Sequence, residues 1–145
     1  MRQSTFRPGA ERREAQLVVA FYDQAWNAWN DDVVEEILSP TFSFRGSLGD
    51  AVQGLEGWRG YRDAVRRAVP DFHNQVIELL AEPGRAAARL RYTGHHHGVL
   101  LGRRGHGQAI SYDGSAFFTA AEGRLTSAWV LGDLDTLRAQ IGHDS

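Results

Sequence analysis

The chain has 145 residues, a formal net charge of −2 and no cysteine. Its length suits one domain, and its near-neutral charge without a basic block argues against nucleic acid and anionic membranes as partners. The lack of cysteine excludes disulfides, thiolate nucleophiles and thiolate metal sites, and it suggests a cytoplasmic protein. Residues 1–13 are polar and rich in arginine, so we expect a flexible N-terminus before one domain over residues 14–145.

Three helices are predicted in the first half of the chain. Their apolar residues recur at helical spacing, and the wide apolar stripe of the first helix indicates packing on a sheet. Asn30 or Asp31 is expected to cap the second helix, and a proline follows both the second and the third. Between these two helices we expect a short strand over 41–45 and a loop over 46–54. The three helices are predicted over residues 14–30, 32–38 and 55–69.

The second half of the chain is predicted to form antiparallel strands, because the apolar period changes to two after Pro70. Short turns at residues 82–84 and 122–123 join successive strands. A closing helix is expected over 133–142, with Asp133 as its N-cap. This order predicts an α+β fold with the helices on one face of a curved sheet. The strands are predicted over residues 72–81, 85–93, 108–121 and 124–131.

Three stretches of the sequence are similar to motifs of one protein family. Residues 21–27 (FYDQAWN) resemble its first helix, and residues 92–98 (YTGHHHG) resemble its glycine–histidine turn. Residues 129–133 (WVLGD), followed by Gln140 and Gly142, resemble its C-terminal ending. On these motifs the chain resembles the SnoaL-like polyketide cyclases of the nuclear transport factor two-like superfamily. The resemblance implies a cone-shaped, curved, mostly antiparallel sheet with three N-terminal helices packed on its concave face.

The resemblance also implies an activity. The namesake of the family closes a polyketide ring by an intramolecular aldol reaction, using an Asp–His pair inside the cone and neither metal nor cofactor. Carried over without gaps, the position of the His falls on Ala116 and that of the Asp on Val130. Neither side chain can transfer a proton, so a catalytic and a non-catalytic function both stay open. Asp133 matches a different acidic residue, which is more widely shared in the ending of the family.

Asp133, Asp113, Arg91 and His96 are the candidate catalytic residues. Asp133 is either a general base, with a pKa raised by burial in a pocket, or the N-cap of the last helix. Arg91, Asp113 and Asp133 resemble the Asp–Arg–Asp set of the limonene epoxide hydrolases; alternatively, they belong to a salt-bridge lattice on the outer sheet face. Strand alternation favours the outer face for Asp113 if Ala116 points inward. His96 matches the turn histidine of the family and is expected to bond the hairpin or to line the pocket rim.

Neither a metal site nor a cofactor is predicted. His95, His96 and His97 are consecutive, and consecutive strand residues point to opposite faces, so the three side chains cannot easily reach one ion. No acidic residue lies nearby in the sequence to complete a set of ligands with His95 and His97.

A set of aromatic side chains from helices and strands is the candidate ligand site. Any one of them suits an ordinary core, but together they exceed what a small core needs and suit a flat polyketide or terpenoid ligand. We therefore expect a ligand-sized cavity between the first helix, the third helix and the concave sheet. The candidate lining residues are Tyr22, Trp26, Phe44, Trp58, Tyr61, Tyr112 and Phe118.

The resemblance predicts a cofactor-independent acid/base enzyme of secondary metabolism, in the first place a cyclase acting on a hydrophobic, polyketide-like ligand. The alternatives are a related hydroxylase, an enzyme like the limonene epoxide hydrolases, and a non-catalytic domain for small-molecule binding or dimerisation. Alternation places Trp129 on the outer sheet face among charged residues such as Arg89 and Asp113. A Trp among paired charges suits an interface, so we expect a homodimer through this face.

Overall fold

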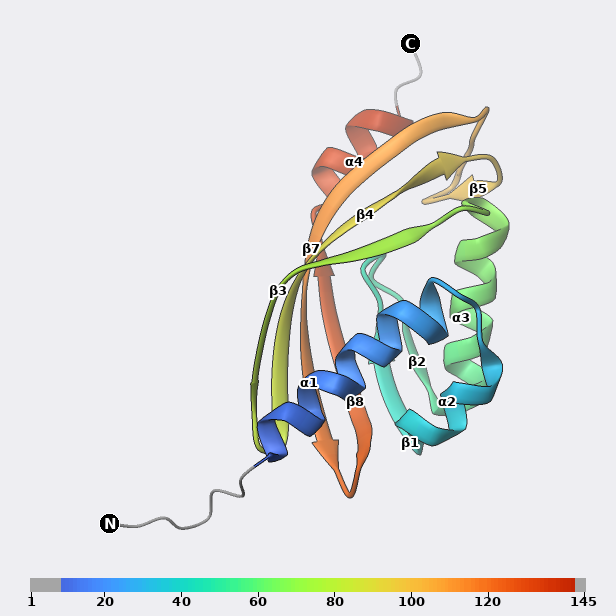
Figure 1. Cartoon of the computed structure of the whole chain (residues 1–145). Coiled ribbons are helices and arrows are strands. Elements are labelled where there is room, and N and C mark those ends of the chain that lie inside the picture. Colours follow the sequence, from blue (N-terminus) through green and yellow to red (C-terminus); the bar gives the residue numbers. More distant parts are fainter. Residues whose placement is uncertain (1–8, 143–145) are drawn as a thin grey trace.

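The computed structural model describes residues 9–142 (Figure 1). Most of the N-terminal segment that we expect to be flexible, up to residue 8, lies outside the described residues. α1 (Ala10–Ala20) begins at Ala10 rather than at residue 14, and η1 (Phe21–Trp26) continues it as a π-helix. Between residues 9 and 142, no helix is both long enough and apolar enough to span a membrane.

The first helical stretch ends earlier than residue 30, at a junction with the sheet. The side-chain amide of Asn27 donates to the backbone oxygen of Asn74 over 2.9 Å, and its oxygen accepts from the backbone nitrogen of Asn74 over 2.8 Å. Both backbone groups of one strand residue are thereby satisfied by one side chain. This contact fixes the end of η1 against the third strand of the chain.

A helix cap and an ion pair position the second and third helices, α2 (Asp31–Ile37) and α3 (Gly54–Ala68). The side chain of Asn30 accepts from the backbone nitrogen of Asp32 over 2.9 Å, so Asn30 is the N-cap of α2, one of the two expected residues. Arg62 of α3 is buried and pairs with the carboxylate of Asp31 over 2.8 Å. The pair ties the middle of α3 to the start of α2.

Six strands form the main sheet, in the order β2-β1-β8-β7-β4-β3. Neighbouring strands are antiparallel, apart from β1 and β8, which run parallel. Register shifts in three of the strand pairs mark bulges, which bend and twist a sheet. The predicted α+β fold with a curved, mostly antiparallel sheet is confirmed. The strands are β1 (Leu38–Arg45), β2 (Ala51–Gln53), β3 (His73–Glu82), β4 (Arg85–His96), β7 (Gln108–Ala121) and β8 (Arg124–Gly132), with the separate hairpin β5 (Val99–Leu100) and β6 (Arg103–Arg104).

Three strands of the main sheet differ from the prediction. β1 begins at Leu38, three residues before the predicted start. β2 lies in the stretch 46–54 that we predict as a loop, because three residues are too few to show an alternating pattern. β4 continues past residue 93 to His96, although Gly94 indicates a turn. The reason for the glycine is space, since a Cβ at Gly94 would lie 2.4 Å from a methyl carbon of Val69.

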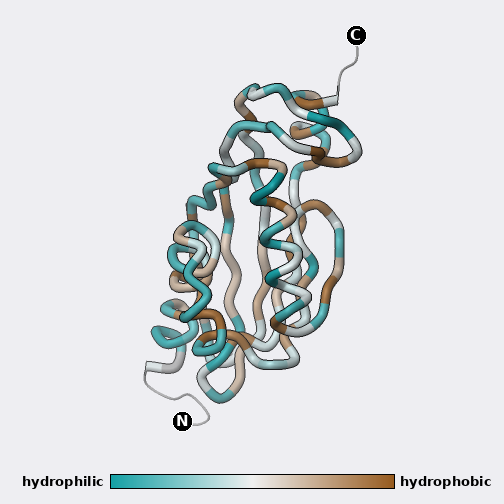
Figure 2. The backbone as a smooth tube through the Cα atoms, turned by 90° about the vertical axis from the view of Figure 1, so that its right-hand side faces the viewer, coloured by the Kyte–Doolittle hydropathy of each residue, from teal (hydrophilic) through white to brown (hydrophobic). Residues whose placement is uncertain are grey.

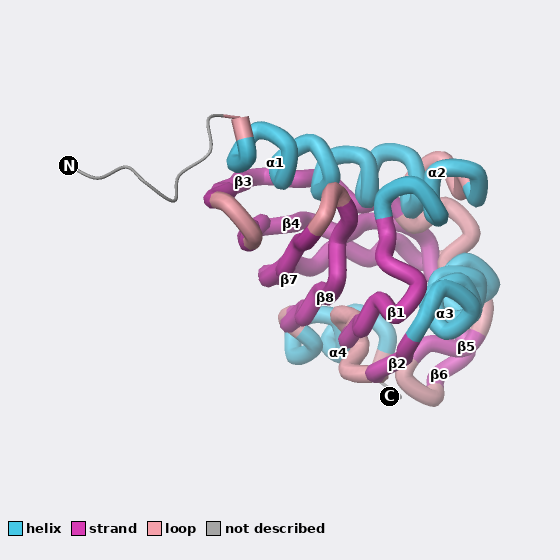
Figure 3. The backbone as a smooth tube through the Cα atoms, turned by 90° about the horizontal axis from the view of Figure 1, so that it is seen from below, coloured by secondary structure: helices cyan, strands magenta, loops and turns pink. Residues whose placement is uncertain are grey.

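The helices α1, α2 and α3 lie on the concave side of the sheet, as predicted (Figures 1 and 3). α1 packs along β3 and β4, and α3 packs along β1 and β2. Figure 2 shows helices that alternate between hydrophilic and hydrophobic residues along their length, as amphipathic helices with one buried face do. The helices and the sheet thereby enclose one aromatic core.

The closing helix α4 (Leu134–Ile141) covers a strand edge instead of a sheet face. β8 ends at Gly132, which pairs with Gly114, so the edge of β7 beyond that point has no strand neighbour on this side. The side-chain amide of Gln140 fills this place: it accepts from the backbone nitrogen of Ser111 and donates to its oxygen, over 2.8 and 2.7 Å. α4 thus satisfies backbone groups that an open edge would leave exposed.

Candidate functional site

The concave sheet face and the helices η1 and α3 line a cavity of about 10 Å³, room for about one water molecule. It lies where the sequence predicts it, but it is far smaller than the roughly 300–1,000 Å³ of ligand pockets. The ligand-sized cavity that we expect there is therefore absent from the described part of the chain in this conformation. The lining residues are Tyr22, Trp26, Phe44, Ser47, Tyr61, Val65, Phe72, Asn74, Tyr92 and Val130.

Aromatic rings fill the space. Tyr61 packs edge-on against Phe44, with ring centroids 5.1 Å apart, and Phe72 stacks on Tyr92 at 5.6 Å. The centroids of Tyr92 and its cross-strand partner Tyr112 are 4.8 Å apart. Such pairs stabilise a core beyond the area that they bury. The cone is therefore closed by contacts between rings.

The structure brings all seven predicted aromatic residues together in the cone. Tyr22, Trp26, Phe44 and Tyr61 line the cavity directly. The other three support this wall from behind: Trp58 packs on Trp26 at 5.6 Å, Tyr112 on Tyr92, and Phe118 on Tyr22 at 6.1 Å.

Tyr92, Phe72 and Asn74 also line the cavity but are missed by the sequence prediction. Tyr92 carries a signal that could have identified it. It alternates in phase with the buried Leu90, on the strand beside the one that carries Tyr112.

All four tyrosines of the chain are buried in the cone, and all four stay protonated well above neutral pH. Burial raises the pKa of Tyr61 to about 12, although bonds from the Leu48 amide and the Ser47 hydroxyl oppose the shift. Burial also raises the pKa values of Tyr22, Tyr92 and Tyr112. The interior therefore offers neutral phenols as hydrogen-bond donors.

Ser47 connects two of these phenols through the loop after β1. Its hydroxyl lies 2.9 Å from the Tyr112 hydroxyl, and the neighbouring Leu48 amide donates to the Tyr61 hydroxyl over 3.3 Å. On the same face of α3, one turn before Tyr61, the indole nitrogen of Trp58 is buried without a hydrogen-bond partner among the described residues. An unpaired buried donor is costly, so the interior has more donors than it uses.

The two positions that correspond to the catalytic pair of the cyclase face each other inside the cone. Ala116 and Val130 are cross-strand partners, and both are buried. The inward direction expected from the alignment is therefore correct, and so is its consequence that Asp113 and Trp129 face outward. Neither inward side chain can accept or donate a proton.

Asp133 has the geometry of a helix cap. Its carboxylate accepts from the backbone nitrogen of Thr136 over 3.1 Å and from the hydroxyl of Thr136 over 2.7 Å. These hydrogen bonds lower the pKa of Asp133, whose side chain is exposed. Of the two alternatives, the structure shows the N-cap: the raised pKa that a general base needs is absent, because the side chain turns back to its own helix instead of entering the cone.

His96 is fully buried, and it holds the hairpin that follows β4. Its Nε2 lies 3.0 Å from the backbone oxygen of Arg103, which can only accept, so Nε2 carries the proton. Its Nδ1 lies 3.2 Å from the side-chain nitrogen of Gln108, which donates. Both ring nitrogens are thus used, as in the structural role that we predict for this residue.

Arg91 and Asp113 are brought together, but on the outer face of the sheet. The two residues are cross-strand partners, and the Arg91 Nε donates to the Asp113 carboxylate over 3.0 Å. Asp113 raises the pKa of Arg91 through this contact. The backbone nitrogen of Asp133 bonds to the backbone oxygen of Asp113, while the carboxylate of Asp133 caps α4. The arrangement is a surface ion pair and does not surround a site within the cone.

His95 has a carboxylate neighbour that sequence distance conceals. Its Nδ1 lies 2.7 Å from Asp71, which also accepts from the backbone nitrogen of His95 over 2.8 Å. The residues are 24 positions apart and meet because β3 and β4 pair in antiparallel register. Over residues 9–142, no group of three or more His, Cys, Asp or Glu side chains could hold a metal ion.

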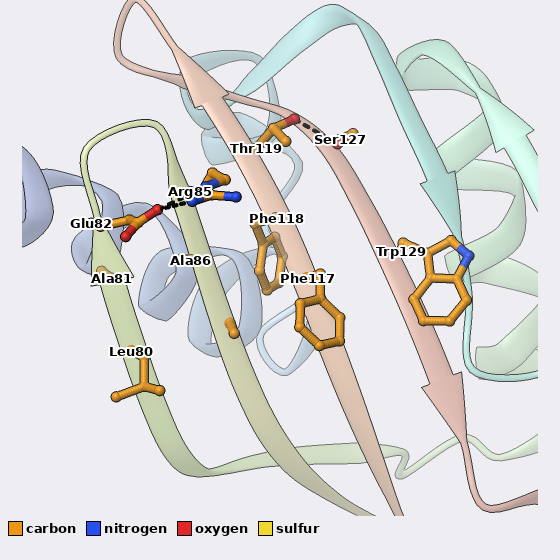
Figure 4. A pocket seen from close by; sticks show the side chains of 11 residues that line it. Leu80, Ala81, Glu82, Arg85, Ala86, Phe117, Phe118, Thr119, Ser127 and Trp129 are labelled. Atoms are coloured by element: carbon orange, nitrogen blue, oxygen red, sulfur yellow. Dashed lines mark hydrogen bonds and ion pairs between the residues drawn. The ribbon is translucent and has the colours of Figure 1, made fainter.

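The outer sheet face carries a row of apolar side chains, which we call the apolar row: Leu80, Ala87, Phe117 and Trp129. Figure 4 shows Leu80, Phe117 and Trp129 of this row. They are direct cross-strand neighbours, and the ring centroids of Phe117 and Trp129 are 6.3 Å apart. Leu80, Phe117 and Trp129 are exposed. A shallow groove of about 480 Å³ runs along the row.

The fold of the chain is similar to three solved structures. A candidate SnoaL-like polyketide cyclase from Jannaschia sp. CCS1 matches at 23 % identity, over 98 % of this chain and 100 % of that chain, with a TM-score of 0.85. TsrD from Streptomyces laurentii matches at 26 %, over 90 % and 96 %, with a TM-score of 0.79. AclR, a candidate hydroxylase from Streptomyces galilaeus, matches at 23 %, over 88 % and 83 %, with a TM-score of 0.73. The structure is thus a nuclear transport factor two-like cone.

The sequence identifies the family within this fold. The family profile described as SnoaL-like polyketide cyclase matches residues 16–141. The chain therefore belongs to the SnoaL-like polyketide cyclase family, as its motifs indicate. Among curated proteins, no match is found.

Proposed function

We propose that this chain closes a ring in a flat, polyketide-like substrate inside the cone and needs neither metal nor cofactor. The observation that carries the proposal is the lining of the cavity: aromatic rings and phenols, with no carboxylate and no imidazole among its described residues. Rings suit a flat substrate, and phenols suit its carbonyl oxygens. Membership of the SnoaL-like polyketide cyclase family supports the class of substrate.

The Ser47 hydroxyl marks the place of a substrate oxygen in this proposal. It bonds to the Tyr112 hydroxyl at 2.9 Å. A ketone oxygen of the substrate takes the place of the Ser47 hydroxyl beside Tyr112 and accepts from the Tyr112 phenol. The raised pKa of Tyr112 keeps this phenol protonated, as donation to an oxyanion requires.

The reaction is an aldol addition within one molecule. An enol carbon attacks the ketone carbon, a C–C bond forms, and the C=O π bond breaks. The ketone oxygen takes up a proton and becomes a hydroxyl, while the enol O–H loses its proton and becomes a carbonyl. A carbon between two carbonyl groups enolises readily, so the nucleophile forms without a carboxylate at Val130 or an imidazole at Ala116. The chain contributes orientation and stabilisation of the developing oxyanion.

The test is the rate of ring closure of a linear poly-β-ketone, followed by chromatography. Tyr112→Phe keeps the ring and removes one donor, so we expect a rate lower by on the order of 10²-fold. Trp129→Phe, on the outer face, is the matched control and should keep the wild-type rate. Equal rates for wild type and Tyr112→Phe would contradict a phenol-based cyclase.

A second candidate function is a non-catalytic domain that binds the same ligands. It is favoured by Ala116 and Val130, the apolar residues at both positions of the catalytic pair. This candidate predicts that the wild-type protein binds the poly-β-ketone and that the ring closes no faster than in buffer. The same experiment therefore separates the two functions.

We further propose that two copies of the chain pair through the outer sheet face. Leu80, Phe117 and Trp129 of the apolar row are exposed, although the guanidinium of Arg45 lies over the Trp129 ring at 5.0 Å, and ion pairs border the row. These pairs are already formed within one copy, so they do not repel an identical face. They join Glu78 to Arg89, Glu82 to Arg85 and Asp113 to Arg91.

A further inference from the structure

The interior cavity and a groove on the surface share one wall. The groove, about 340 Å³ in volume, lies between α3, β5 and the loop after β1. Tyr61 and Val65 line both the groove and the cavity. The groove alone is large enough for a small molecule, whereas the closed cavity holds about one water. Of the two shared residues, Tyr61 is the larger, so its ring is the main barrier between the groove and the other phenols of the cone.

The closed position of Tyr61 depends on a glycine. A Cβ at Gly46 would lie 2.1 Å from both Cζ and the hydroxyl oxygen of Tyr61, so the ring lies directly over the Gly46 backbone. Gly46 has no positive φ, and space is the reason for the glycine. The packed position of the Tyr61 ring thus requires a glycine at position 46.

Few polar contacts hold the ring in this seat. Its hydroxyl accepts from the Leu48 amide over a long 3.3 Å, and its edge packs on Phe44. On the groove side, Val99 is exposed and Leu101 is partly buried, so apolar surface is available to a ring that moves outward. A rotation about the side-chain bonds of Tyr61 moves the phenol from its apolar contact with Phe44 to the apolar surface of the groove.

We propose that the groove is the outer half of the ligand site and that Tyr61 is the movable wall between the two halves. The inference rests on the proposed function. In the open form, a ring of the ligand takes the place of the Tyr61 ring beside Phe44 and Trp26, and the rest of the ligand lies along Val99. Asp50 alone among the described residues of the groove carries a charge, so the outer end of the ligand is not anionic.

The chain contains no cysteine, so a single introduced thiol reports access to the cavity. Val130→Cys places that thiol on the cavity wall, and 4,4′-dithiodipyridine, a neutral flat disulfide, is the probe. In this background, Tyr61→Ala should raise the labelling rate by about tenfold or more, because the wall is gone. Tyr92→Ala is the matched control: it removes the same ring from the same cavity, on the side of β4 and away from the groove, and should raise the rate less than about threefold.

Equal acceleration by both variants would mean general loosening and would overturn the proposal. Tyr61→Phe keeps the core packed and removes only the hydroxyl with its polar contacts to Leu48 and Ser47, so it should label faster than the parent even if Tyr61→Ala folds poorly. An unchanged rate in Tyr61→Phe, with both variants folded by circular dichroism, would also overturn it. In addition, Asp50→Asn should speed labelling by the anionic 5,5′-dithiobis(2-nitrobenzoate) more than labelling by the neutral probe. None of these readouts uses a substrate, so their failure is distinct from failure of the proposed function.

Discussion

The two faces of β4, β7 and β8 carry opposite surfaces on the same strands. Inward, Tyr112 is 3 % exposed and Ala116 not at all, whereas their outward neighbours Phe117 and Trp129 are 55 % and 47 % exposed. Inside, each ring contacts other rings of the same chain. Outside, the apolar row stays exposed apart from the Arg45 guanidinium over the Trp129 ring. The inner face is therefore complete in one copy, and the proposed dimer would bury the outer face.

The polar groups of the two faces differ as well. Those inside are neutral hydroxyls and amides in hydrogen bonds, such as Ser47 with Tyr112. Those outside are exposed ion pairs, such as Arg91 with Asp113. Because ion pairs at a surface are screened by salt, the outer face responds to ionic strength, whereas the inner face responds to alkali. The difference supports the two proposals, a ligand site inside and an assembly surface outside.

The sharpest way to break this comparison is to place the same charge on each face. Ala116→Asp buries a carboxylate with no partner among apolar neighbours, so we expect the free energy of unfolding to fall by roughly 3 kcal/mol or more. Phe117→Asp, one residue along the strand, should change it by less than about 0.5 kcal/mol in the monomer. Urea denaturation measures both. Similar losses in the two variants would show that the faces are not distinct.

The next effect concerns assembly. Trp129→Asp places a charge at the β8 end of the apolar row without disturbing the cone, and we expect it to weaken self-association by about 2 kcal/mol or more. Sedimentation velocity at micromolar concentration should show a dimer for wild type and a monomer for Trp129→Asp. Val19→Asp, an exposed apolar position on α1, is the control and should stay dimeric. A monomeric wild type would refute the outer-face dimer.

Alkaline pH tests the inner face alone. The chain contains no lysine, so the four tyrosines are its main titrating side chains near pH 10. Since their folded pKa values are raised, the folded chain holds these protons more tightly than the unfolded chain. Stability is complete below the ordinary tyrosine pKa of 10.0 and falls as pH rises through the folded values.

The loss should reach about 1.4 kcal/mol per pH unit for each phenol. Thermal melting at about pH 8 and about pH 11 measures it, and Tyr22→Phe should make the loss smaller. A melting temperature that is constant over this range would mean that the phenols are reached by solvent.

Asp133 gives the smallest effect. Asn and Asp cap helices about equally well, so Asp133→Asn should keep the stability and, as an exposed position outside the cone, the rate of ring closure. Asp133→Ala should lose about 1 kcal/mol of stability through the lost cap. A folded Asp133→Asn protein without ring closure would place Asp133 in the reaction after all.

The parts of the fold that local patterns determine are predicted well from the sequence. β7 and β8 follow a clear alternation and a Glu122-Gly123 turn, and they appear close to the predicted residues. β2 is too short for a pattern, and the contact of Asp71 with His95 depends on a register between strands. The inward direction of Ala116 could be predicted from the alignment with the family, but the closed cavity could not.

The cavity closes because Tyr61 packs over Gly46, a contact between two parts of the chain that no local pattern reveals. The same holds for Ser47, whose loop reaches Tyr112 across the cone. Residue types and apolar periods predict which side of each strand is buried, whereas the volume of the cavity depends on the curvature of the whole sheet.

The central claim is that the ligand enters the cone and not the groove on the outer face. Benzoylacetone, a flat aromatic 1,3-diketone, should quench tryptophan fluorescence by contact with Trp26. The measurement is therefore a corrected fluorescence titration of wild type, Trp26→Phe and Trp129→Phe. We predict that saturable quenching persists in Trp129→Phe and is largely lost in Trp26→Phe. Quenching that persists in Trp26→Phe and disappears in Trp129→Phe would place the ligand on the outer face and contradict the account.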